Sequence, residues 1–482
     1  MNIIFFSSEV FPFSKTGGLA DVSAGLPKAL KKLGNDIRIF TPYYKSCEKF
    51  NPVLIQDSKI AIKIGGTDVE AEIYQTTLPD SDVPVYMIDN KNYFFRESLY
   101  SWNNVDYEDN FSRFVLFQRA SIEYLKKINF IPDIVHSNDW PSALVSAYFK
   151  TIYSGFFPRV KTVFTIHNIG FQGFYWVWDM KLTGLPFELF NWRQLEYYGK
   201  INLMKGGIVF SDAVTTVSPT YSREILSAQY AYGLQSVLEE YKNKISGIIN
   251  GVDYGEWSPE TDKYIPYKYG IDTLENKYEN KKMLLKQCGF SDNGAPLFGM
   301  ISRLVEQKGI RFIIENIKQL MEKKMKIVIL GTGDKFIESR LESIGKEHPD
   351  KFKVFINFNT ELSHLIEAGS DIYLMPSLFE PCGLNQLYSM KYGTIPLARR
   401  TGGLADTIID ATPQNIKIGE ATGFLFNNID NLEFLNKINK AIELFNDKSL
   451  WNRIIKNAMS KKWSWDFSAG KYLELYDSLI KP

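Results

Sequence analysis

Short apolar runs rich in β-branched residues alternate with longer helical patterns along this chain, and the alternation restarts in its middle. In the first half we expect strands at residues 3–7, 37–41, 85–88, 134–137, 162–166 and 213–217. Helical patterns fit residues 24–33, 111–127, 142–151, 201–210 and 219–228. Strands that alternate with helices in this way predict βαβ units and a parallel sheet. Residues 60–78 predict an inserted β-hairpin instead, because two extended runs flank Gly65 and Gly66.

The second series begins after a turn signal at residues 249–253. Its expected strands are residues 297–302, 327–330, 354–357, 372–375 and 394–398, each followed by a helical stretch. A chain of 482 residues is too long for one core, since single cores stop growing near about 250–300 residues. We therefore predict an α/β protein of two doubly wound, Rossmann-like domains, residues 1–248 and 249–462. The polar, Tyr-rich residues 261–277 predict a loop, and the amphipathic tail predicts a C-terminal helix, residues 463–482, that returns to the first domain.

Charge and cysteine usage exclude several classes of protein. Lys and Arg total 56 against 55 for Asp and Glu, so no electrostatic feature indicates nucleic acid or an anionic membrane surface. The three cysteines, Cys47, Cys288 and Cys382, form no CxxC motif, which argues against a disulfide framework or a cysteine-based zinc site and favours a cytoplasmic protein. The first residues lack the pattern of a signal or transit peptide, and no stretch approaches the roughly 20 apolar residues of a membrane span.

The hexapeptide TGGLAD occurs twice, at residues 16–21 and 401–406. Each copy follows a strand region and precedes a helix. Glycines there let the backbone approach a ligand, and a helix N-terminus suits phosphate. Ligands of open α/β sheets gather beyond the carboxyl ends of the strands, so two facing domains would enclose a cleft with one glycine turn on each wall. For either copy the alternative is a helix-start turn with a structural role only. Neither copy is a GxGxxG fingerprint, and no P-loop occurs.

KTGGLADV (15–22) resembles the signature of bacterial glycogen synthases and plant starch synthases. HSNDW (136–140), TIHNIGFQG (165–173), INGVDYGEWSPETD (249–262), SRLVEQKG (302–309) and PSLFEPCGLNQLYSMKYGTIP (376–396) resemble the same family in the same order. The resemblance covers essentially the whole chain. It implies the GT-B architecture, two domains facing across a cleft, and retaining transfer of glucose from a nucleotide-glucose to the non-reducing end of an α-1,4-glucan.

The sequence departs from the family pattern at three positions. Asn138 stands where a His is frequent, and Pro141 where the family more often carries a His or Gln. Tyr388 occupies the position of a second Glu found in wider GT-B transferases, so only Glu380 is carried over.

The resemblance implies cations for a leaving diphosphate. Arg303 and Lys308 follow the strand at residues 297–302 and would form the diphosphate clamp, one as a planar fork and the other as a point charge. Lys15 would approach the same diphosphate from the other domain, beside Gly17 and Gly18.

Other residues would bind the sugar. We expect Glu380 to open a helix that begins near Cys382 and to bind the glucose hydroxyls, with backbone N–H groups offered by Cys382, Gly383 and Leu384. We interpret Cys382 as a small residue in a tight turn rather than a nucleophile.

At the other strand ends, His167 would hydrogen-bond the donor glucose near the transition state, beside Asn168. Asp139 and Asp21 would bind sugar on the donor or acceptor side, and for both the alternative is a helix N-cap.

The resemblance implies no cofactor and no metal, and no DxD motif in a metal-ligand context occurs. No carboxylate nucleophile stands out for a double displacement, which favours a front-face route to retention. ADP-glucose is expected by analogy with bacterial relatives. A donor UDP-glucose or a small sugar acceptor is the alternative. An α-glucan phosphorylase would need a pyridoxal phosphate lysine and a longer chain, and a non-catalytic glucan-binding protein would show erosion of the clamp.

Two questions stay open in the sequence. Trp176, Trp178 and Trp192 fit either a glucan-binding surface or a buried core. No motif indicates an oligomeric state.

Overall fold

The computed structural model describes residues 1–103 and 105–481, and the chain divides into two compact units. Unit 1 comprises Met1–Gly251 together with the C-terminal segment from Trp465, and unit 2 comprises Val252–Ser464. The sequence analysis placed the corresponding boundaries after residues 248 and 462. No helix in the described part of the chain is long and apolar enough to span a membrane.

Unit 1 is built on a ten-stranded sheet in which seven neighbouring strands run parallel, in the order β15-β14-β10-β9-β1-β2-β6. These strands are β1 (Asn2–Phe6), β2 (Asp36–Pro42), β6 (Pro84–Asp89), β9 (Ile134–Asn138), β10 (Lys161–Ile166), β14 (Ala213–Thr216) and β15 (Ile245–Gly247). All residues of β9 are buried, as expected of a strand covered on both faces by helices. The predicted hairpin is confirmed as β4 (Ile60–Ile64) and β5 (Thr67–Thr77), with positive φ at Gly65 and Gly66.

The helices of unit 1 depart from prediction mainly at their beginnings. They are α1 (Gly18–Lys32), α2 (Lys91–Phe94), α3 (Asn110–Lys127), α4 (Leu144–Lys150), α5 (Met180–Thr183), α6 (Leu203–Phe210), α7 (Pro219–Glu224), α8 (Gln235–Glu240) and α19 (Trp465–Ile480). Helix α1 begins at Gly18 rather than residue 24, because the glycine turn is itself the first helical turn with Gly17 as N-cap. Helix α6 begins later than predicted, because residues 200–202 form a strand.

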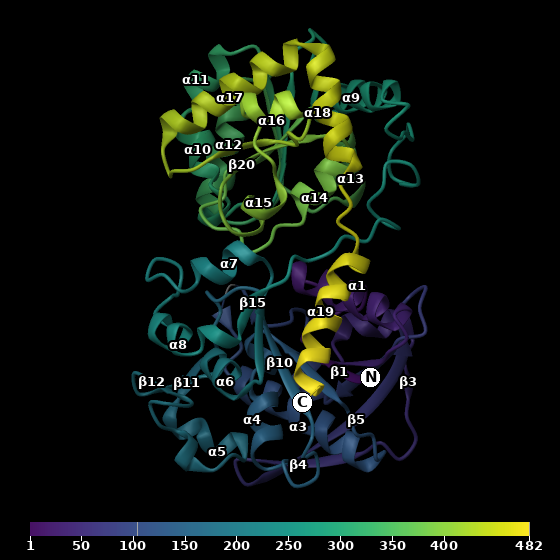
Figure 1. Ribbon diagram of the computed structural model, residues 1–482, viewed down its shortest axis with the longest axis vertical. Coiled ribbons are helices and arrows are strands. Elements are labelled where there is room, and N and C mark those ends of the chain that lie inside the picture. Colours follow the sequence, from purple (N-terminus) through teal and green to yellow (C-terminus); the bar gives the residue numbers. More distant parts are fainter. Residues whose placement is uncertain (104, 482) are drawn as a thin grey trace. The chain divides into compact units, whose positions relative to one another are not determined.

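The return of the C-terminal helix to unit 1 is confirmed. Helix α19 lies beside α1 in Figure 1, and a Cβ added at Gly25 of α1 would lie 1.9 Å from Trp465 Nε1. The hydroxyl of Tyr476 on α19 lies 2.6 Å from Nδ1 of the buried His136 on β9. On the other side of the same ring, Nε2 lies 2.6 Å from the Thr165 hydroxyl on β10. A buried polar chain thus ties the last helix to the centre of the sheet.

Unit 2 contains a six-stranded parallel sheet in the order β18-β17-β16-β19-β20-β21. The strands are β16 (Leu297–Ile301), β17 (Lys326–Leu330), β18 (Phe352–Phe355), β19 (Ile372–Met375), β20 (Ile395–Arg399) and β21 (Phe424–Phe426). The helices are α9 (Glu275–Cys288), α10 (Ile310–Glu315), α11 (Ile317–Glu322), α12 (Lys335–Glu347), α13 (Thr360–Gly369), α14 (Asn385–Lys391), α15 (Gly402–Thr407), α16 (Pro413–Ile418), α17 (Asn431–Asn446) and α18 (Lys448–Ser460). Five of the six strands were predicted, and β21 was missed.

The predicted loop at residues 261–277 is correct except for its last turn, since α9 begins at Glu275. This loop is held by a buried cluster. The Asp262 carboxylate lies 2.7 Å from His364 Nδ1, and the His364 ring stacks on Trp257 with centroids 3.9 Å apart. Trp257 also stacks on Tyr388 at 4.3 Å, so the position where wider transferases carry a second Glu here serves packing.

Candidate active site

Three neighbouring strands of unit 1 deliver polar residues to one edge of the sheet. Strands β1, β9 and β10 run parallel, with Phe6 opposite Ser137 and Thr165 opposite Asn138. The residues that follow these strands, Glu9, Asp139 and His167, therefore emerge at the same edge, where ligands of open α/β sheets gather.

Asp139 adopts a backbone conformation that non-glycine residues avoid. Its φ is +53° and its ψ 178°, a strain that clusters at functional sites. Its carboxylate accepts a hydrogen bond of 2.8 Å from the His167 backbone N–H, and burial raises the pKa of Asp139 to about 7. Asp139 occupies the N-cap position of a short 3-10 turn, as the alternative interpretation proposed, but its side chain makes no capping bond there.

The His167 ring is oriented by its neighbour on the adjacent strand. Its Nε2 lies 2.9 Å from Oδ1 of Asn138, which donates from Nδ2 to the Phe6 carbonyl at 2.9 Å. Burial lowers the pKa of His167 to about 3, so the ring is neutral at physiological pH. The structure thus brings together Asp139 and His167, which the sequence analysis had singled out separately. The side chain of Asn168 instead closes a local turn by accepting the Gly170 N–H at 3.0 Å.

The first glycine turn is held by Glu9, which sequence reasoning missed. The Glu9 carboxylate accepts the Thr16 N–H at 2.5 Å, the Thr16 hydroxyl at 2.6 Å and the Gly17 N–H at 3.2 Å. The Tyr100 hydroxyl donates to the same carboxylate at 2.8 Å. Glu9 is buried, and a charged residue directly after a buried strand was the available signal.

Lys15 and Asp21 pair with each other across this turn. Lys15 Nζ lies 2.7 Å from Asp21 Oδ1, and both side chains are partly exposed. Gly17 is the N-cap of α1 and Asp21 lies in the first helical turn, so the N-cap interpretation of Asp21 is wrong. A carboxylate in that position complements the helix dipole.

The two copies of TGGLAD stand in opposite surroundings. A Cβ added at Gly17 would meet no described atom within 4 Å. A Cβ at Gly402 would lie 2.0 Å from the Glu380 carbonyl oxygen, and one at Gly403 would lie 2.1 Å from that of Cys382. The glycines of the second copy therefore allow the backbone of residues 380–382 to pack closely against them, which agrees with the alternative of a structural role. The first copy faces open space.

In unit 2 an ion pair links the loops that follow the neighbouring strands β16 and β19. Lys308 Nζ lies 2.7 Å from Glu380 Oε2, and the Ser377 hydroxyl donates to the same oxygen at 3.0 Å. The Leu378 N–H donates to the Gln307 carbonyl at 2.8 Å. Both members of the ion pair are largely buried, so the cation is held in place by a carboxylate.

Glu380 does not open a helix, contrary to the prediction. Helix α14 begins at Asn385, because Gly383 has a φ of +72° that no helix accommodates. The buried Cys382 and Gly383 accept hydrogen bonds through their carbonyls from Gln386 Nε2, at 3.1 and 3.0 Å, and Leu384 precedes the helix as N-cap. The loop from Glu380 to Leu384 is thus fixed by backbone contacts.

The two predicted clamp residues differ in their surroundings. Lys308 is paired with Glu380, whereas the exposed Arg303 side chain makes no hydrogen bond or ion pair within residues 1–103 and 105–481. Arg399, which the sequence analysis did not single out, fixes the loop after β19 by donating from Nε to the Ser377 carbonyl at 2.9 Å and to Leu378.

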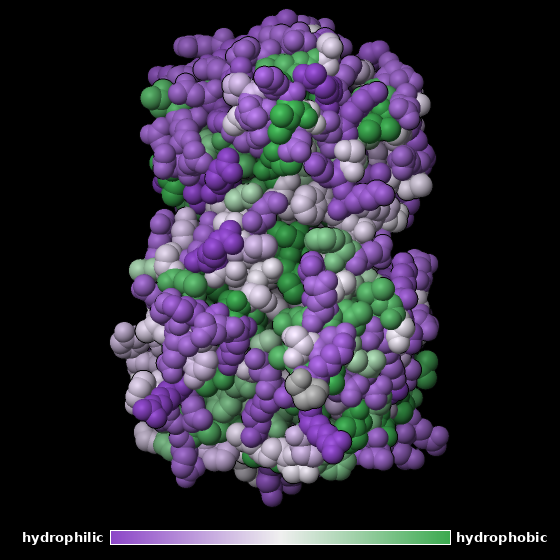
Figure 2. Space-filling model, in the orientation of Figure 1, coloured by the Kyte–Doolittle hydropathy of each residue, from purple (hydrophilic) through white to green (hydrophobic). Residues whose placement is uncertain are grey.

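A small antiparallel sheet in unit 1, β11 (Phe174–Trp176), β13 (Lys200–Asn202) and β12 (Glu196–Tyr197), carries exposed aromatic rings. Trp176 on β11, Trp178 in the 3-10 turn that follows it and Trp192 in the loop before β12 are 67%, 74% and 67% exposed, so the core interpretation of the three indoles is wrong. Figure 2 shows pale, weakly polar surface where Figure 1 labels β11 and β12. Tyr175 points the other way and stacks on Phe111 with centroids 4.4 Å apart, which anchors the sheet.

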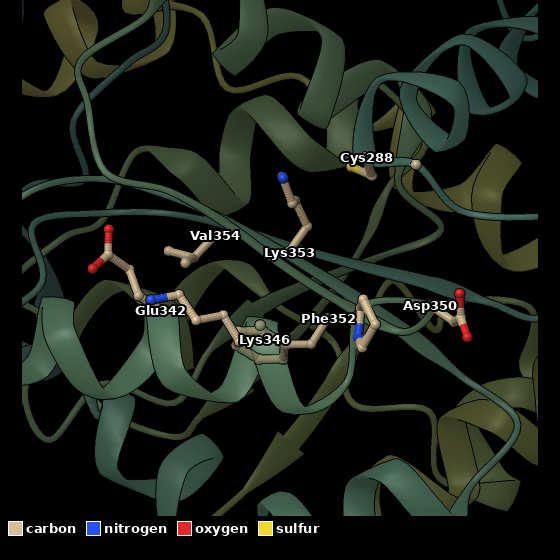
Figure 3. Close-up of a pocket in the computed structure, with 10 residues that line it drawn as sticks. Cys288, Glu342, Lys346, Asp350, Phe352, Lys353 and Val354 are labelled. Atoms are coloured by element: carbon tan, nitrogen blue, oxygen red, sulfur yellow. The ribbon is translucent and has the colours of Figure 1, made fainter.

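A cavity of about 570 Å³ lies elsewhere in unit 2. Figure 3 shows Glu342 and Lys346 from α12 and Lys353 from β18 along it. Strand β18 is the terminal strand of the sheet, and no predicted site residue lines the cavity. In the part of the chain that the structure describes, no three His, Cys, Asp or Glu side chains are grouped as metal ligands. That the reaction needs no metal stays a prediction.

Comparison with known families matches both units. Residues 2–240 match the starch synthase catalytic domain, and residues 285–461 match the glycosyl transferases group 1.

Individual proteins match along the full length. A glycogen synthase of Koribacter versatilis is 41% identical, over 99% of this chain and 98% of its own. A glycogen synthase of Thermotoga maritima is 42% identical, over 100% and 99%.

Two solved structures are similar to this chain over almost its whole length. The catalytic domain of starch synthase IV from Arabidopsis thaliana, bound to ADP and acarbose, is 33% identical with a TM-score of 0.92, over 100% of this chain and 99% of its own. A sucrose-phosphate synthase from Thermosynechococcus elongatus, 16% identical over 99% of this chain and 98% of its own with a TM-score of 0.60, shares the fold.

Proposed function

This chain belongs to the glycogen and starch synthase family of glycosyltransferases, and from that premise we propose that it transfers glucose from ADP-glucose to the non-reducing end of an α-1,4-glucan with retention of configuration. The donor base and the polymeric acceptor are the specific parts of this proposal. The observation that carries it is the buried Lys308–Glu380 pair at the carboxyl edge of the unit 2 sheet, in a chain that matches over its full length a starch synthase bound to ADP and acarbose.

In this proposal Lys308 and Arg303 stabilise the leaving diphosphate. Departure of a nucleoside diphosphate builds negative charge on its oxygens, and fixed cations lower the energy of that transition state. Glu380 holds Lys308 in position before the donor arrives. The unpaired Arg303 guanidinium offers a planar fork for two phosphate oxygens. Lys15, Gly17, which has space around it for an outside group, and Gly18 stay predictions for the same diphosphate.

The polar edge of unit 1 is proposed to bind the transferred glucose. His167 and Asp139 lie at the ends of adjacent strands and are linked by a hydrogen bond. A neutral His167 adds no positive charge beside a sugar that becomes cationic in the transition state. Glu380 and the backbone of Cys382, Gly383 and Leu384 stay predictions as further donor contacts.

For retention we propose a front-face route, in which the departing phosphate oxygen takes the acceptor's proton. The glycosidic bond to phosphate breaks, the bond to the acceptor oxygen forms on the same face, and the proton moves to the nucleoside diphosphate. This route needs no carboxylate nucleophile beneath the sugar. Closure around the substrates would exclude water that could hydrolyse the donor.

The exposed aromatic face of the β11–β13–β12 sheet is proposed as a contact for the glucan. Aromatic faces pack against the apolar C–H faces of pyranose rings, and rings on a rigid sheet lose little conformational entropy on binding. The sheet is anchored next to the candidate site: Gly173 and Gln172 accept backbone hydrogen bonds from Leu203 and Met204, and Gln172 donates to the Tyr232 carbonyl at 2.9 Å.

Release of the nucleoside diphosphate tests this function. Purified protein would be given ADP-glucose or UDP-glucose, each with and without glycogen. Glycogen-dependent ADP release is expected. Preference for UDP-glucose would overturn the donor assignment alone. Release that depends on a small sugar instead of glycogen would overturn the acceptor assignment. No release from either donor by folded protein would overturn the activity.

A further inference from the structure

The hydrogen bonds around Asn138 determine where the neutral His167 ring carries its proton. The Phe6 carbonyl can only accept, so the Asn138 amide nitrogen must face it, at 2.9 Å. The Asn138 oxygen is thereby directed at His167 Nε2, also at 2.9 Å. Turning the amide over would set its oxygen against the Phe6 oxygen. Because Asn138 is fully buried, no water would replace the hydrogen bond to Phe6 that this rotation breaks.

An amide oxygen can only accept, so Nε2 must hold the hydrogen. A neutral imidazole has one N–H, which leaves Nδ1 as a hydrogen-bond acceptor. Throughout residues 1–103 and 105–481 we find no hydrogen-bond partner for Nδ1. The His167 side chain is partly exposed. It lies at the same edge of the sheet as Asp139, which follows β9 directly.

We propose that Asn138 is a positioning residue that holds His167 in the Nε2–H tautomer, so that Nδ1 accepts a hydrogen bond from a hydroxyl group of the transferred glucose. This inference rests on the proposed function and adds the direction of one of its hydrogen bonds. A histidine at position 138 could donate as well as accept, whereas the Asn138 oxygen can only accept, so the asparagine fixes which partner holds the hydrogen.

The electrostatic consequence concerns the charge of His167 during transfer. A carboxylate at position 138 would favour an imidazolium, as an opposite charge in contact with a histidine does. The ionisable side chains already near His167 are Asp139, which accepts its backbone N–H, and His136. An imidazolium could only donate, and it would place positive charge beside a sugar that becomes cationic. A neutral amide avoids both effects.

Nitrogen NMR of the histidine rings tests the assignment without turnover. The chain has only four histidines, at positions 136, 167, 348 and 364, so the ring signals of the whole protein can be resolved. The signals lost in His167→Gln identify His167. We expect a protonated Nε2 and an unprotonated Nδ1 at neutral pH. A protonated Nδ1, alone or together with Nε2, would overturn the inference.

The variant Asn138→Asp extends the test to catalysis. We expect its His167 ring to be doubly protonated at neutral pH and its kcat to fall by about tenfold to a hundredfold, with a smaller change in donor KM. The rate should recover as pH rises and the imidazolium loses its proton. The wild type, in which burial raises the pKa of Asp139 to about 7, gives the reference profile, and the variant should show one further titration beyond it. Unchanged His167 signals and an unchanged pH profile would contradict the inference.

Asn316→Asp, in which a buried asparagine of unit 2 is replaced, is the matched control and should leave the His167 signals unchanged. If Asn138→Asp fails to fold, the wild-type spectrum alone decides. Absence of glycogen-dependent ADP release from the wild type would reject the proposed function and leave that spectrum unaffected.

Discussion

At the scale of single residues, Lys308, the proposed catalytic cation of unit 2, is positioned by a buried carboxylate. Lys308 contacts Glu380, whose carboxylate also accepts a hydrogen bond from the Ser377 hydroxyl. Taking two charges out of water costs free energy that their attraction offsets only when the geometry is good. A side chain held in this way needs little rearrangement when negative charge develops on a leaving group.

Replacement of this cation separates catalysis from stability. Lys308→Ala is expected to lower kcat by about a hundredfold or more, because it removes stabilisation of the leaving diphosphate. It should also destabilise unit 2 by about 1–3 kcal/mol, since Glu380 stays buried without its partner. Initial rates of ADP release and urea unfolding measure the two effects.

The control is the double variant Lys308→Met with Glu380→Gln. It leaves no unpaired charge, so it should recover most of the stability and none of the turnover. Near-normal turnover in Lys308→Ala would remove this lysine from the diphosphate clamp.

Cys382 provides a second test at this scale. Cys382→Ser is expected to keep most of its turnover, because the contacts that fix this loop run through the backbone carbonyls of Cys382 and Gly383. Steady-state rates of the folded variant check this. A folded but inactive variant would revive the nucleophile interpretation.

At the scale of elements, the two glycine turns have different partners. Gly17→Ala should cost at most about 1 kcal/mol of stability, since nothing lies within 4 Å of the added Cβ. Its donor KM should rise tenfold or more if the diphosphate approaches this turn. Gly402→Ala should destabilise unit 2 by about 1–3 kcal/mol, because its φ is +43° and the Cβ would collide with the Glu380 carbonyl.

Thermal unfolding and donor titration of both variants distinguish these effects. An unchanged donor KM in Gly17→Ala would leave the first turn as a helix start only.

The aromatic sheet of unit 1 makes its own prediction. Trp176→Ala and Trp178→Ala should weaken glycogen binding by roughly threefold to tenfold each, the value of one aromatic contact. Turnover with saturating short maltooligosaccharides should change little. Affinity electrophoresis in glycogen gels measures binding, and Trp102→Ala, an exposed indole on another strand, is the control. Equal retardation of all three variants would refute the glucan contact.

Features that depend on neighbouring residues could be predicted from the sequence, whereas features that depend on residues far away in the chain could not. Strand β19 was predicted with its observed bounds, because a buried parallel strand is a continuous apolar run. The start of α1 was missed because glycines usually end helices, whereas here a carboxylate eight positions before Gly17 supplies the contacts of the turn. The exposure of Trp176 could not be predicted from the residue type. It follows from the packing of the neighbouring Tyr175 against Phe111, which leaves Trp176 on the opposite, exposed face of the strand. The Lys308–Glu380 contact joins residues 72 positions apart, so its partners were identified by resemblance alone.

At the scale of the whole molecule, buried histidines make unit 1 sensitive to acid. Burial lowers the pKa of both His136 and His167 to about 3, against 6.5 in an unfolded chain. Between these values the two histidines bind more protons in the unfolded state than in the folded state, so their contribution to stability is complete above pH 6.5 and is lost as pH falls toward 3. Asp139, whose pKa burial raises to about 7, contributes in the opposite direction. Each histidine adds up to about 1.4 kcal/mol per pH unit to this slope.

His136→Gln should flatten the pH dependence of unfolding in this window, while lowering stability at neutral pH through loss of the Tyr476 and Thr165 contacts. Urea unfolding at a series of pH values is the measurement. An unaltered slope would mean that His136 is not the group that titrates.

Helix α19 has a consequence for biosynthesis. Unit 1 needs residues from Trp465 onward, yet unit 2, Val252–Ser464, is translated between its two parts. Those 464 − 251 = 213 residues take the ribosome about 10 to 40 s at 5–20 residues per second. During that time the surface of α1 around Gly25 lacks Trp465, and His136 lacks Tyr476. A nascent chain therefore displays an unfinished apolar face until α19 has left the ribosome, and until then chaperones can compete with this helix for it.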